Sequence, residues 1–291
     1  MHIELEGLRI SLPDSSQNSA PCIFTDDKKH ESLTVSRDKV PAANWNAADI
    51  MSQTRKEFQS GFGESMKVLN QQPLVLLGQP GQQMKFKFEE FGAVEYGWVA
   101  VALMSSVRFV QITYMTRDEG DGQAKFEHML NSVSDPNLNF IAKMKGGWVH
   151  RYAGPIALDV PINMDPPHVY SFFLSDDPGT NIVVKLYRLG QSAEPFPTLQ
   201  QETARDSRDG AAIDNQEFGA FSAAGGNGTF TKYVSSRRDA AGNEREFVQQ
   251  LQIAFPDGLT AIVSGRTPQA SRGQLENTLN QLMRTLERSD R

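Results

Sequence analysis

The chain of 291 residues contains two similar halves, and this duplication limits its possible folds more than any other feature. Residues 7–13 (GLRISLP) are matched by residues 154–161 (GPIALDVP), a separation of about 150 residues. Further matches keep the same order and nearly the same separation: 23–27 with 173–177, 33–37 with 184–188, and 95–99 with 244–248. Chance similarity would not preserve both order and separation, so the sequence predicts a tandem repeat of one module.

The repeat divides the chain into two domains and a short connection. We assign residues 1–134 to copy one, residues 135–147 to a linker and residues 148–291 to copy two. Each copy has a common domain size and is long enough to bury its own core. The Asp135-Pro136 pair predicts the end of the preceding helix, because proline cannot continue an α-helix.

Each copy is predicted to be rich in strands, with helices inserted early and late. Residues 33–36 alternate apolar and polar side chains, as a half-buried strand does. Residues 46–58 change to helical spacing, with Asn46 as a plausible cap, and residues 125–133 form a second helical pattern. This order predicts an α+β fold, built from two tandem copies of an antiparallel β-sheet with helices packed on one face.

Charge and cysteine content exclude several classes of protein. Lys and Arg number 29 against 35 Asp and Glu, without a long run of one sign, so a nucleic-acid backbone is not an expected partner. The one cysteine, Cys22, permits no intramolecular disulfide. Residues 1–6 lack the pattern of a signal peptide, and no apolar run approaches the ~18 residues that span a bilayer. We therefore expect a cytoplasmic protein with no stable membrane insertion.

Motifs typical of enzymes are missing from the sequence. The five histidines are scattered, with no pair at the spacing of zinc ligands on one element. Ser264 lacks the preceding glycine of a nucleophile elbow, and residues 225–228 (GGNG) lack the Lys-Ser/Thr and helix of a phosphate-binding loop. Asp26 and Asp27 could suggest a pair of catalytic carboxylates, but adjacent residues on a strand point to opposite faces. The two are more simply interpreted as turn residues before Lys28. We expect no enzymatic activity, no metal and no cofactor.

Three segments of copy one carry a family resemblance. Residues 9–13 (RISLP), 32–38 (SLTVSRD) and 73–81 (PLVLLGQPG), followed by a meander and a closing helix, resemble the DcrB-like family, which has a PsbP-like α+β fold. The second segment is most similar to the effector-associated (Eag) chaperones of bacterial type VI secretion. The resemblance covers most of copy one and, less exactly, copy two, where Leu189 stands in place of Asp38.

The resemblance implies a function and a binding groove. Chaperones of this kind bind the N-terminal transmembrane helices of a secreted effector, shield them in the cytoplasm and help load the effector onto the secretion spike. They act as paired subunits, so the tandem chain is expected to be a monomer that forms an intramolecular pseudo-dimer. The family's apolar and glutamine pattern places the client-binding groove at Cys22, Phe24, Val35, Gln111, Phe172, Leu174, Leu186, Gln250 and Gln252.

Two strand patterns leave alternatives open. Residues 99–104 are apolar on both faces, which suits either a client on one face or a strand buried between layers of its own protein. Residues 247–253 place Gln250 and Gln252 on one face, where their amides would satisfy polar groups of a transmembrane helix or would face solvent. A rival interpretation of the whole chain is a small-molecule-binding or hydrolytic protein that uses the same sheet.

Overall fold

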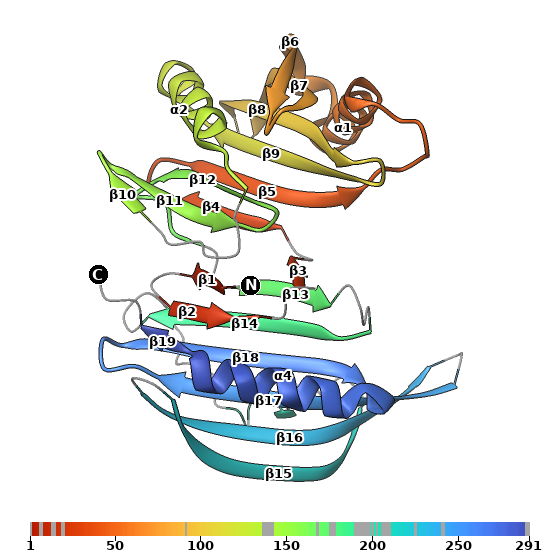
Figure 1. Cartoon of the computed structure of the whole chain (residues 1–291). Coiled ribbons are helices and arrows are strands. Elements are labelled where there is room, and N and C mark those ends of the chain that lie inside the picture. The colour runs from red at the N-terminus through yellow and green to blue at the C-terminus, as the bar shows by residue number, and fades with distance from the viewer. Residues whose placement is uncertain are drawn as a thin grey trace. The chain divides into compact units, whose positions relative to one another are not determined.

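The fold is given by a computed structural model of the chain (Figure 1). It describes residues 2–5, 8–12, 16–18, 21–90, 92–135, 143–166, 169–174, 179–188, 199, 201, 203–204, 211–223, 226–239 and 242–288. The chain divides into two compact units. The first unit comprises Ala20–Asn137 and Ala142–Pro167, and the second comprises Met1–Ser19, Leu138–Ile141 and His168–Arg291.

An antiparallel sheet of six strands forms the centre of the first unit. Its order is β4-β5-β9-β8-β7-β6. The strands are β4 (Cys22–Asp26), β5 (Glu31–Lys39), β6 (Lys67–Leu76), β7 (Gln79–Glu90), β8 (Ala93–Ser105) and β9 (Arg108–Thr116). The sheet is a meander of hairpins from β6 to β9, and β9 then pairs with β5.

The main sheet of the second unit repeats this order strand for strand. It runs β15-β16-β17-β18-β14-β13, with β3 (Ser16–Asn18) added beside β13. The strands are β13 (Val169–Leu174), β14 (Asn181–Arg188), β15 (Ala212–Ala223), β16 (Gly226–Asp239), β17 (Gly242–Ala254) and β18 (Leu259–Pro268). The predicted α+β class and the tandem organisation are therefore confirmed.

Each sequence copy gives its first hairpin to the unit built by the other copy. The hairpin of β1 (His2–Leu5) and β2 (Leu8–Ser11) lies in the second unit, where β2 contacts the closing helix α4 (Arg272–Thr285) and pairs with β19 (Glu287–Arg288). The matching hairpin, formed by the strands β11 (Trp148–Ala153) and β12 (Ile156–Pro161), lies in the first unit, where β12 contacts α2 (Glu119–Ser132).

This exchange means that the sequence boundaries do not coincide with the compact units. Residues 1–134 and 148–291 describe the repeats, but Leu8 and Ile10 are buried in one unit and Ile156 and Leu158 in the other. Part of the expected linker also pairs, because β10 (Lys143–Lys145) extends the sheet of β11 and β12. The order of apolar and polar residues in a hairpin does not reveal which of the two closing helices, α2 or α4, will bury it.

The helices of the first unit lie on opposite faces of its sheet, so the prediction that they share one face is wrong. Helix α1 (Ala47–Phe62), capped by Asn46 and followed by the short η1 (Gly63–Ser65), packs on the face of Phe86 and Val99. Helix α2 packs on the other face, where Phe126 contacts Trp98. Figure 1 shows β6, β7 and β8 between the two helices.

The opposed helices explain the doubly apolar strand. Val99, Ala100, Val101 and Ala102 have no exposed surface, because α1 covers one face of β8 and α2 the other. This strand is therefore buried between layers of its own protein. In the second unit, α4 follows η2 (Gln269–Ser271), and it packs on the face of Gly265, where a Cβ would lie 2.6 Å from Leu275. Within the described part of the chain, no helix has the length and apolar character to cross a membrane.

Candidate functional site

Five residues of the expected groove are core residues of their own units. Cys22, Phe24, Val35 and Phe172 are at most 1% exposed, and Leu186 is 3% exposed. The side chain of Leu174 lies outside the described residues. Contact between the client and these apolar residues stays a prediction. It would require the parts of the protein that bury β4 or β13 to move.

The exchanged hairpin lies close to the apolar face of β4. Tyr152 on β11 is buried, and burial together with the neighbouring Cys22 thiol raises the pKa of its hydroxyl. Thr25 on β4 also forms a β-bridge with Asp165, which follows β12. Residues from copy two therefore stabilise the first strand of the sheet built by copy one.

Gln250 and Gln252 lie on the face of the second sheet opposite α4. Gln249 pairs in register with Gly265 beneath α4, so the alternating side chains of β17 place Gln250 and Gln252 on the other face. Gln250 is only 3% exposed, whereas Gln252 is half-buried. The solvent-facing interpretation is therefore wrong for Gln250.

In the part of the chain that the structure describes, three buried side-chain oxygens on this face have no hydrogen-bond partner. They are the Oε1 atom of Gln250, the Oγ1 atom of Thr231 and the Oγ atom of Ser235. Thr231 and Gln250 are direct cross-strand neighbours on β16 and β17. Buried polar atoms in folded proteins are nearly always hydrogen-bonded, so this cluster is unusual. Both ends of the Gln249 amide, on the face beneath α4, also lack a partner among the described residues.

The same face opens toward the edge strand β15. Phe218, the register partner of Thr231, is 51% exposed, and Ala220 and Thr229 beside it are exposed. Two rows of register partners cross β15 to β18 here, and neither contains a charged residue. We call these rows the amide face; they consist of Phe218, Thr231, Gln250, Ser264, Ala220, Thr229, Gln252 and Ile262.

The remaining groove residue, Gln111, is already hydrogen-bonded within copy one. Its Oε1 accepts from Thr54 Oγ1 of α1 at 3.3 Å, and its Nε2 donates to Thr113 Oγ1 at 3.2 Å. Both ends of the amide are therefore used by the protein itself. In this structure Gln111 anchors α1 to the sheet.

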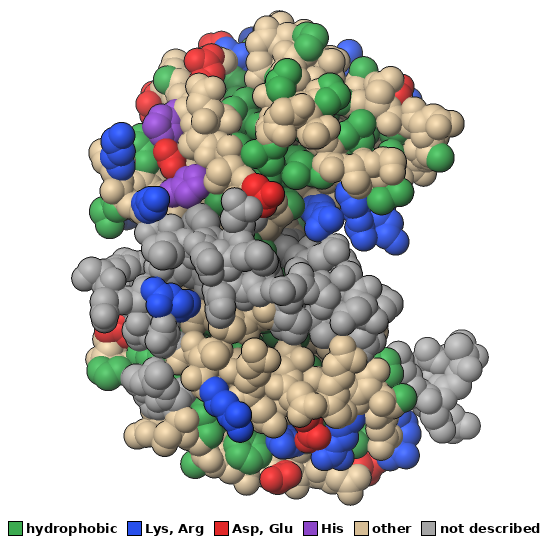
Figure 2. Space-filling view, in the orientation of Figure 1, with side chains coloured by type: hydrophobic (Ala, Val, Ile, Leu, Met, Phe, Trp, Pro, Cys, Tyr) green, Lys and Arg blue, Asp and Glu red, His purple; other side chains and the backbone are tan. Residues whose placement is uncertain are grey.

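A second polar cluster joins residues that are far apart in the sequence. His150 Nδ1 lies 2.8 Å from Asp159 Oδ1, and its Nε2 lies 3.0 Å from Ser134 Oγ. His128 Nε2 lies 2.9 Å from the other oxygen of Asp159, and its ring stacks on Trp148. Figure 2 shows histidine side chains gathered with an acidic side chain at the surface of the first unit.

Sequence reasoning missed this cluster because its members stand on separate elements with no common spacing. Hydrogen bonds connect Ser134 to His150 and His150 to Asp159, which is the arrangement of the catalytic triad in a serine hydrolase. Both backbone groups of Ser134 are bonded to Ala157, at 2.8 and 2.9 Å, and Asp159 N–H donates to Ser132 Oγ at 2.7 Å. These hydrogen bonds therefore connect the end of α2 to the exchanged hairpin, so the cluster has a structural role. Among the described residues, no group of His, Cys, Asp and Glu is placed to hold a metal ion.

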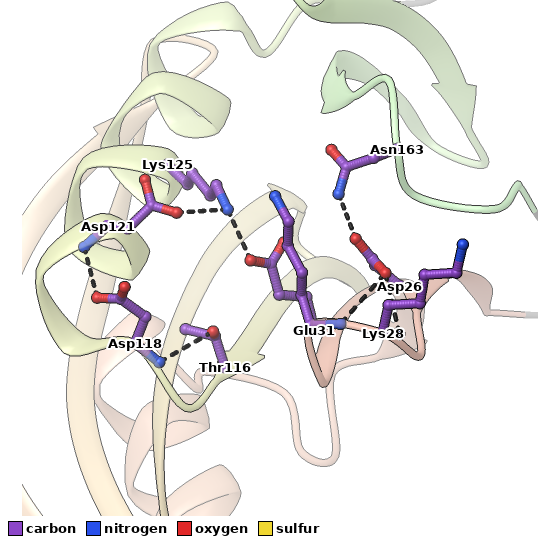
Figure 3. Close-up of polar contacts among 9 residues, drawn as sticks. Asp26, Lys28, Glu31, Thr116, Asp118, Asp121, Lys125 and Asn163 are labelled. Atoms are coloured by element: carbon purple, nitrogen blue, oxygen red, sulfur yellow. Dashed lines mark hydrogen bonds and ion pairs between the residues drawn. The ribbon is translucent and has the colours of Figure 1, made fainter.

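A polar depression of about 720 Å³ lies at the N-terminus of α2 (Figure 3). Glu31 in its wall is 4% exposed and lies 2.6 Å from Lys125 Nζ, which also contacts Asp121 at 2.6 Å. Burial lowers the pKa of Lys125, but the hydrogen bonds with Asp121 and Glu31 outweigh this effect and raise it overall. The charged side chains of this depression are largely paired with one another, so we interpret them as a structural ion-pair network.

Asp26 closes the turn after β4 and reaches the segment that follows β12. Its carboxylate accepts from the backbone N–H groups of Lys28 and Lys29 at 3.1 and 3.3 Å, and from the Asn163 amide (Figure 3). Burial raises the pKa of Asp26, but these hydrogen bonds outweigh it and leave the pKa below its ordinary value. The expected turn role of Asp26 is thus extended by a contact between the two sequence copies.

The sequence matches no family model, and no curated protein matches it. Solved structures are similar at low identity. The apo immunity protein TplEi of the type VI secretion system (T6SS) from Pseudomonas aeruginosa is 7% identical, with 99% of this chain and 97% of that chain covered and a TM-score of 0.48.

Two further structures resemble the chain less closely. For the Tle4–Tli4 complex the values are 7% identity, 99% and 97% coverage, and a TM-score of 0.46. A P. aeruginosa protein of unknown function, PA94, described as a putative regulator, is 12% identical over 40% of this chain and 81% of its own, with a TM-score of 0.31. At these values the likeness does not extend to what the proteins bind.

Proposed function

We propose that this protein is a non-enzymatic, cytoplasmic chaperone that binds the N-terminal transmembrane helices of a type VI secretion effector and helps load it onto the secretion spike. The sequence resemblance suggests the client, and the amide face supports it. The single observation that carries the proposal is the pair of unpartnered, buried oxygens of Thr231 and Gln250 beside the exposed Phe218.

The dimensions and chemistry of the amide face suit an apolar helix. A transmembrane helix of ~20 residues is about 30 Å long, and β16 and β17, with 14 and 13 residues, extend over roughly 43–46 Å. Inside membranes, transmembrane helices form hydrogen bonds with one another through small polar side chains. The amide and hydroxyl groups of this face can form the same kind of hydrogen bond with such a helix. From β15 to β18 these rows place no charge against the apolar side chains of the client, and Lys185 of β14 follows Ile262 in register.

Co-purification with the effector's N-terminal segment tests the proposal. Phe172→Asp is a poor probe, because Phe172 is a core residue and a charge there would unfold the unit. The Gln252→Asp variant, changed at a half-buried position of the amide face, should fold and lose the client, whereas the Gln274→Asp variant, changed at an exposed position of α4, should retain the client. Retention of the client by a folded Gln252→Asp variant would remove the amide face from the proposal. Binding of the effector through its toxic domain alone would contradict the chaperone role.

The hydrogen-bond relay from Ser134 to Asp159 favours a second candidate function, hydrolysis by a serine nucleophile. A fluorophosphonate probe tests it directly, because such probes phosphonylate the hydroxyl of an activated serine, forming a P–O bond as fluoride leaves. Labelling of the native chain that is abolished by Ser134→Ala and reduced by His150→Ala would support the hydrolase. An unlabelled chain would leave the relay as a structural contact.

A further inference from the structure

We propose that Arg37, Lys39 and Arg108 form a binding site for an acidic segment of a partner protein, whose carboxylates pair with these three cations. The site lies at the end of β5 and the start of β9, within the first unit. The amide face belongs to the second unit, so this inference goes beyond the proposed function and does not depend on the client helix.

The strand register brings the three cations to one corner of the sheet. In the pairing of β5 with β9, Lys39 is opposite Arg108 and Arg37 is opposite Val110. Direct cross-strand partners share a face of the sheet, and so do residues two apart along a strand, so the three side chains project from the same face. Figure 2 shows Lys and Arg side chains gathered at this end of β5.

These cations have no counter-charge of their own. Within the part of the chain that the structure describes, none of the three side chains forms a hydrogen bond or an ion pair. The adjacent acid, Asp38, points to the opposite face of β5, where its carboxylate accepts from Ser36 Oγ at 3.0 Å. The corner therefore carries an uncompensated positive charge.

Arg37 differs from an ordinary cation at a protein surface. Water can solvate the exposed Lys39, but the Nε atom of Arg37 is enclosed and has no hydrogen-bond partner among the described residues, although the residue as a whole is partly exposed. Burial lowers the pKa of Arg37 and the charge of Arg108 lowers it further, against an opposing effect of Tyr152. Because a guanidinium keeps its charge in proteins, an anion bound here would offset the repulsion between the two arginines.

The surroundings favour a protein segment over a membrane or a nucleic acid. Three cations, in a chain of net charge −6, are fewer than the about four to eight that attract an anionic membrane, and they do not form the stripe that follows a nucleic-acid backbone. Val107, which precedes Arg108, is 63% exposed. A protein partner can therefore place an apolar side chain beside its carboxylates.

The spacing of the two arginines suggests how the carboxylates are arranged. Arg37 and Arg108 are diagonal neighbours across β5 and β9, a relationship that separates residues by roughly 7–8 Å. Residues i and i+2 of an extended peptide point to the same side and lie about 6.6–6.8 Å apart. An extended segment with acidic residues at alternate positions therefore fits the pair.

Two capped peptides carrying an uncharged dye test the site with the full chain. One has two glutamates separated by a valine, and the other has glutamine in place of both glutamates. Fluorescence anisotropy at low salt should show about tenfold tighter binding of the glutamate peptide, because the glutamine peptide cannot form charge-assisted hydrogen bonds. Arg37→Gln and Arg108→Gln should each weaken the glutamate peptide about tenfold.

The matched control is Arg55→Gln, which removes a cation from an exposed position of α1 and should leave the affinity unchanged. Circular dichroism checks the folding of each variant. Should Arg37→Gln fail to fold, Lys39→Gln at an exposed position replaces it and should weaken the glutamate peptide about threefold. Equal affinity for the two peptides, or equal effects of Arg108→Gln and Arg55→Gln, would overturn the site.

Inorganic phosphate and vesicles of phosphatidylcholine and phosphatidylserine represent the other possible occupants. If the native chain bound either of these without preferring the glutamate peptide, and Arg108→Gln abolished the binding, a protein segment would be overturned as the ligand. The Gln252→Asp variant should bind the glutamate peptide as the native chain does. Failure of this site can therefore be distinguished from failure of the chaperone function.

Discussion

His128 of copy one lies 2.9 Å from the carboxylate of Asp159 in copy two, within a single compact unit. The contact links α2 to the exchanged hairpin of β11 and β12. Through its other oxygen the same carboxylate bonds His150. One side chain therefore connects two elements that belong to different sequence repeats.

Removal of this carboxylate should loosen the exchanged hairpin. Asp159→Ala leaves His128 and His150 without their shared acceptor, and we expect the free energy of unfolding to fall by about 1–3 kcal/mol. Urea denaturation monitored by tryptophan fluorescence measures the change. Asp27→Ala, at an exposed turn position, is the matched control and should change stability by less than about 0.5 kcal/mol. Equal effects of the two substitutions would contradict the role assigned to Asp159.

Asp26 should make stability depend on pH in the acid range. Its pKa is lower in the folded protein than in the unfolded chain, so its contribution is complete above the ordinary carboxyl pKa and is lost as the pH falls through the folded value. At neutral pH, Asp26→Asn should lower the free energy of unfolding by about 1–3 kcal/mol. The difference from the native chain should shrink as urea titrations move from pH 6 toward pH 3. A difference that stays constant over this range would rule out the titration of Asp26 as its cause.

The buried pair of Lys125 and Glu31 should be more sensitive to the loss of one partner than of both. Lys125→Met alone leaves the Glu31 carboxylate buried without its cation, and we expect a loss of about 3–5 kcal/mol. Adding Glu31→Gln removes the charge and should restore most of this loss. Thermal denaturation of the two single variants and the double variant measures the coupling, and additive effects would show that the pair does not act as a unit.

Gly97 on β8 should tolerate no side chain. A Cβ there would lie 2.2 Å from the ring of Phe86, so Gly97→Ala must displace the aromatic cluster beneath α1 and should destabilise the protein by about 1–3 kcal/mol. Gly61 in α1 has open space around it, so Gly61→Ala should be neutral or stabilise by up to about 1 kcal/mol. Equal stability of the two variants would contradict this packing.

The sequence by itself determined the repeated module, its α+β class and several local features. The cap at Asn46 was readable because capping depends on residues three apart, and the burial of residues 99–102 was one of two possibilities visible in an unbroken apolar run. The polar character of this part of the strand was also visible, since Gln249, Gln250 and Gln252 stand among the apolar residues of 247–253.

Only the tertiary structure decided which elements meet. The exchange of hairpins, the placement of helices on both faces and the meeting of His128, His150 and Asp159 depend on contacts between residues far apart in the chain, and periodicity carries no information about such partners. The distinction between Gln111 and Gln250 has the same origin. Each is a glutamine on a strand, but α1 supplies Thr54 to the first, whereas none of the described side chains bonds the amide oxygen of the second.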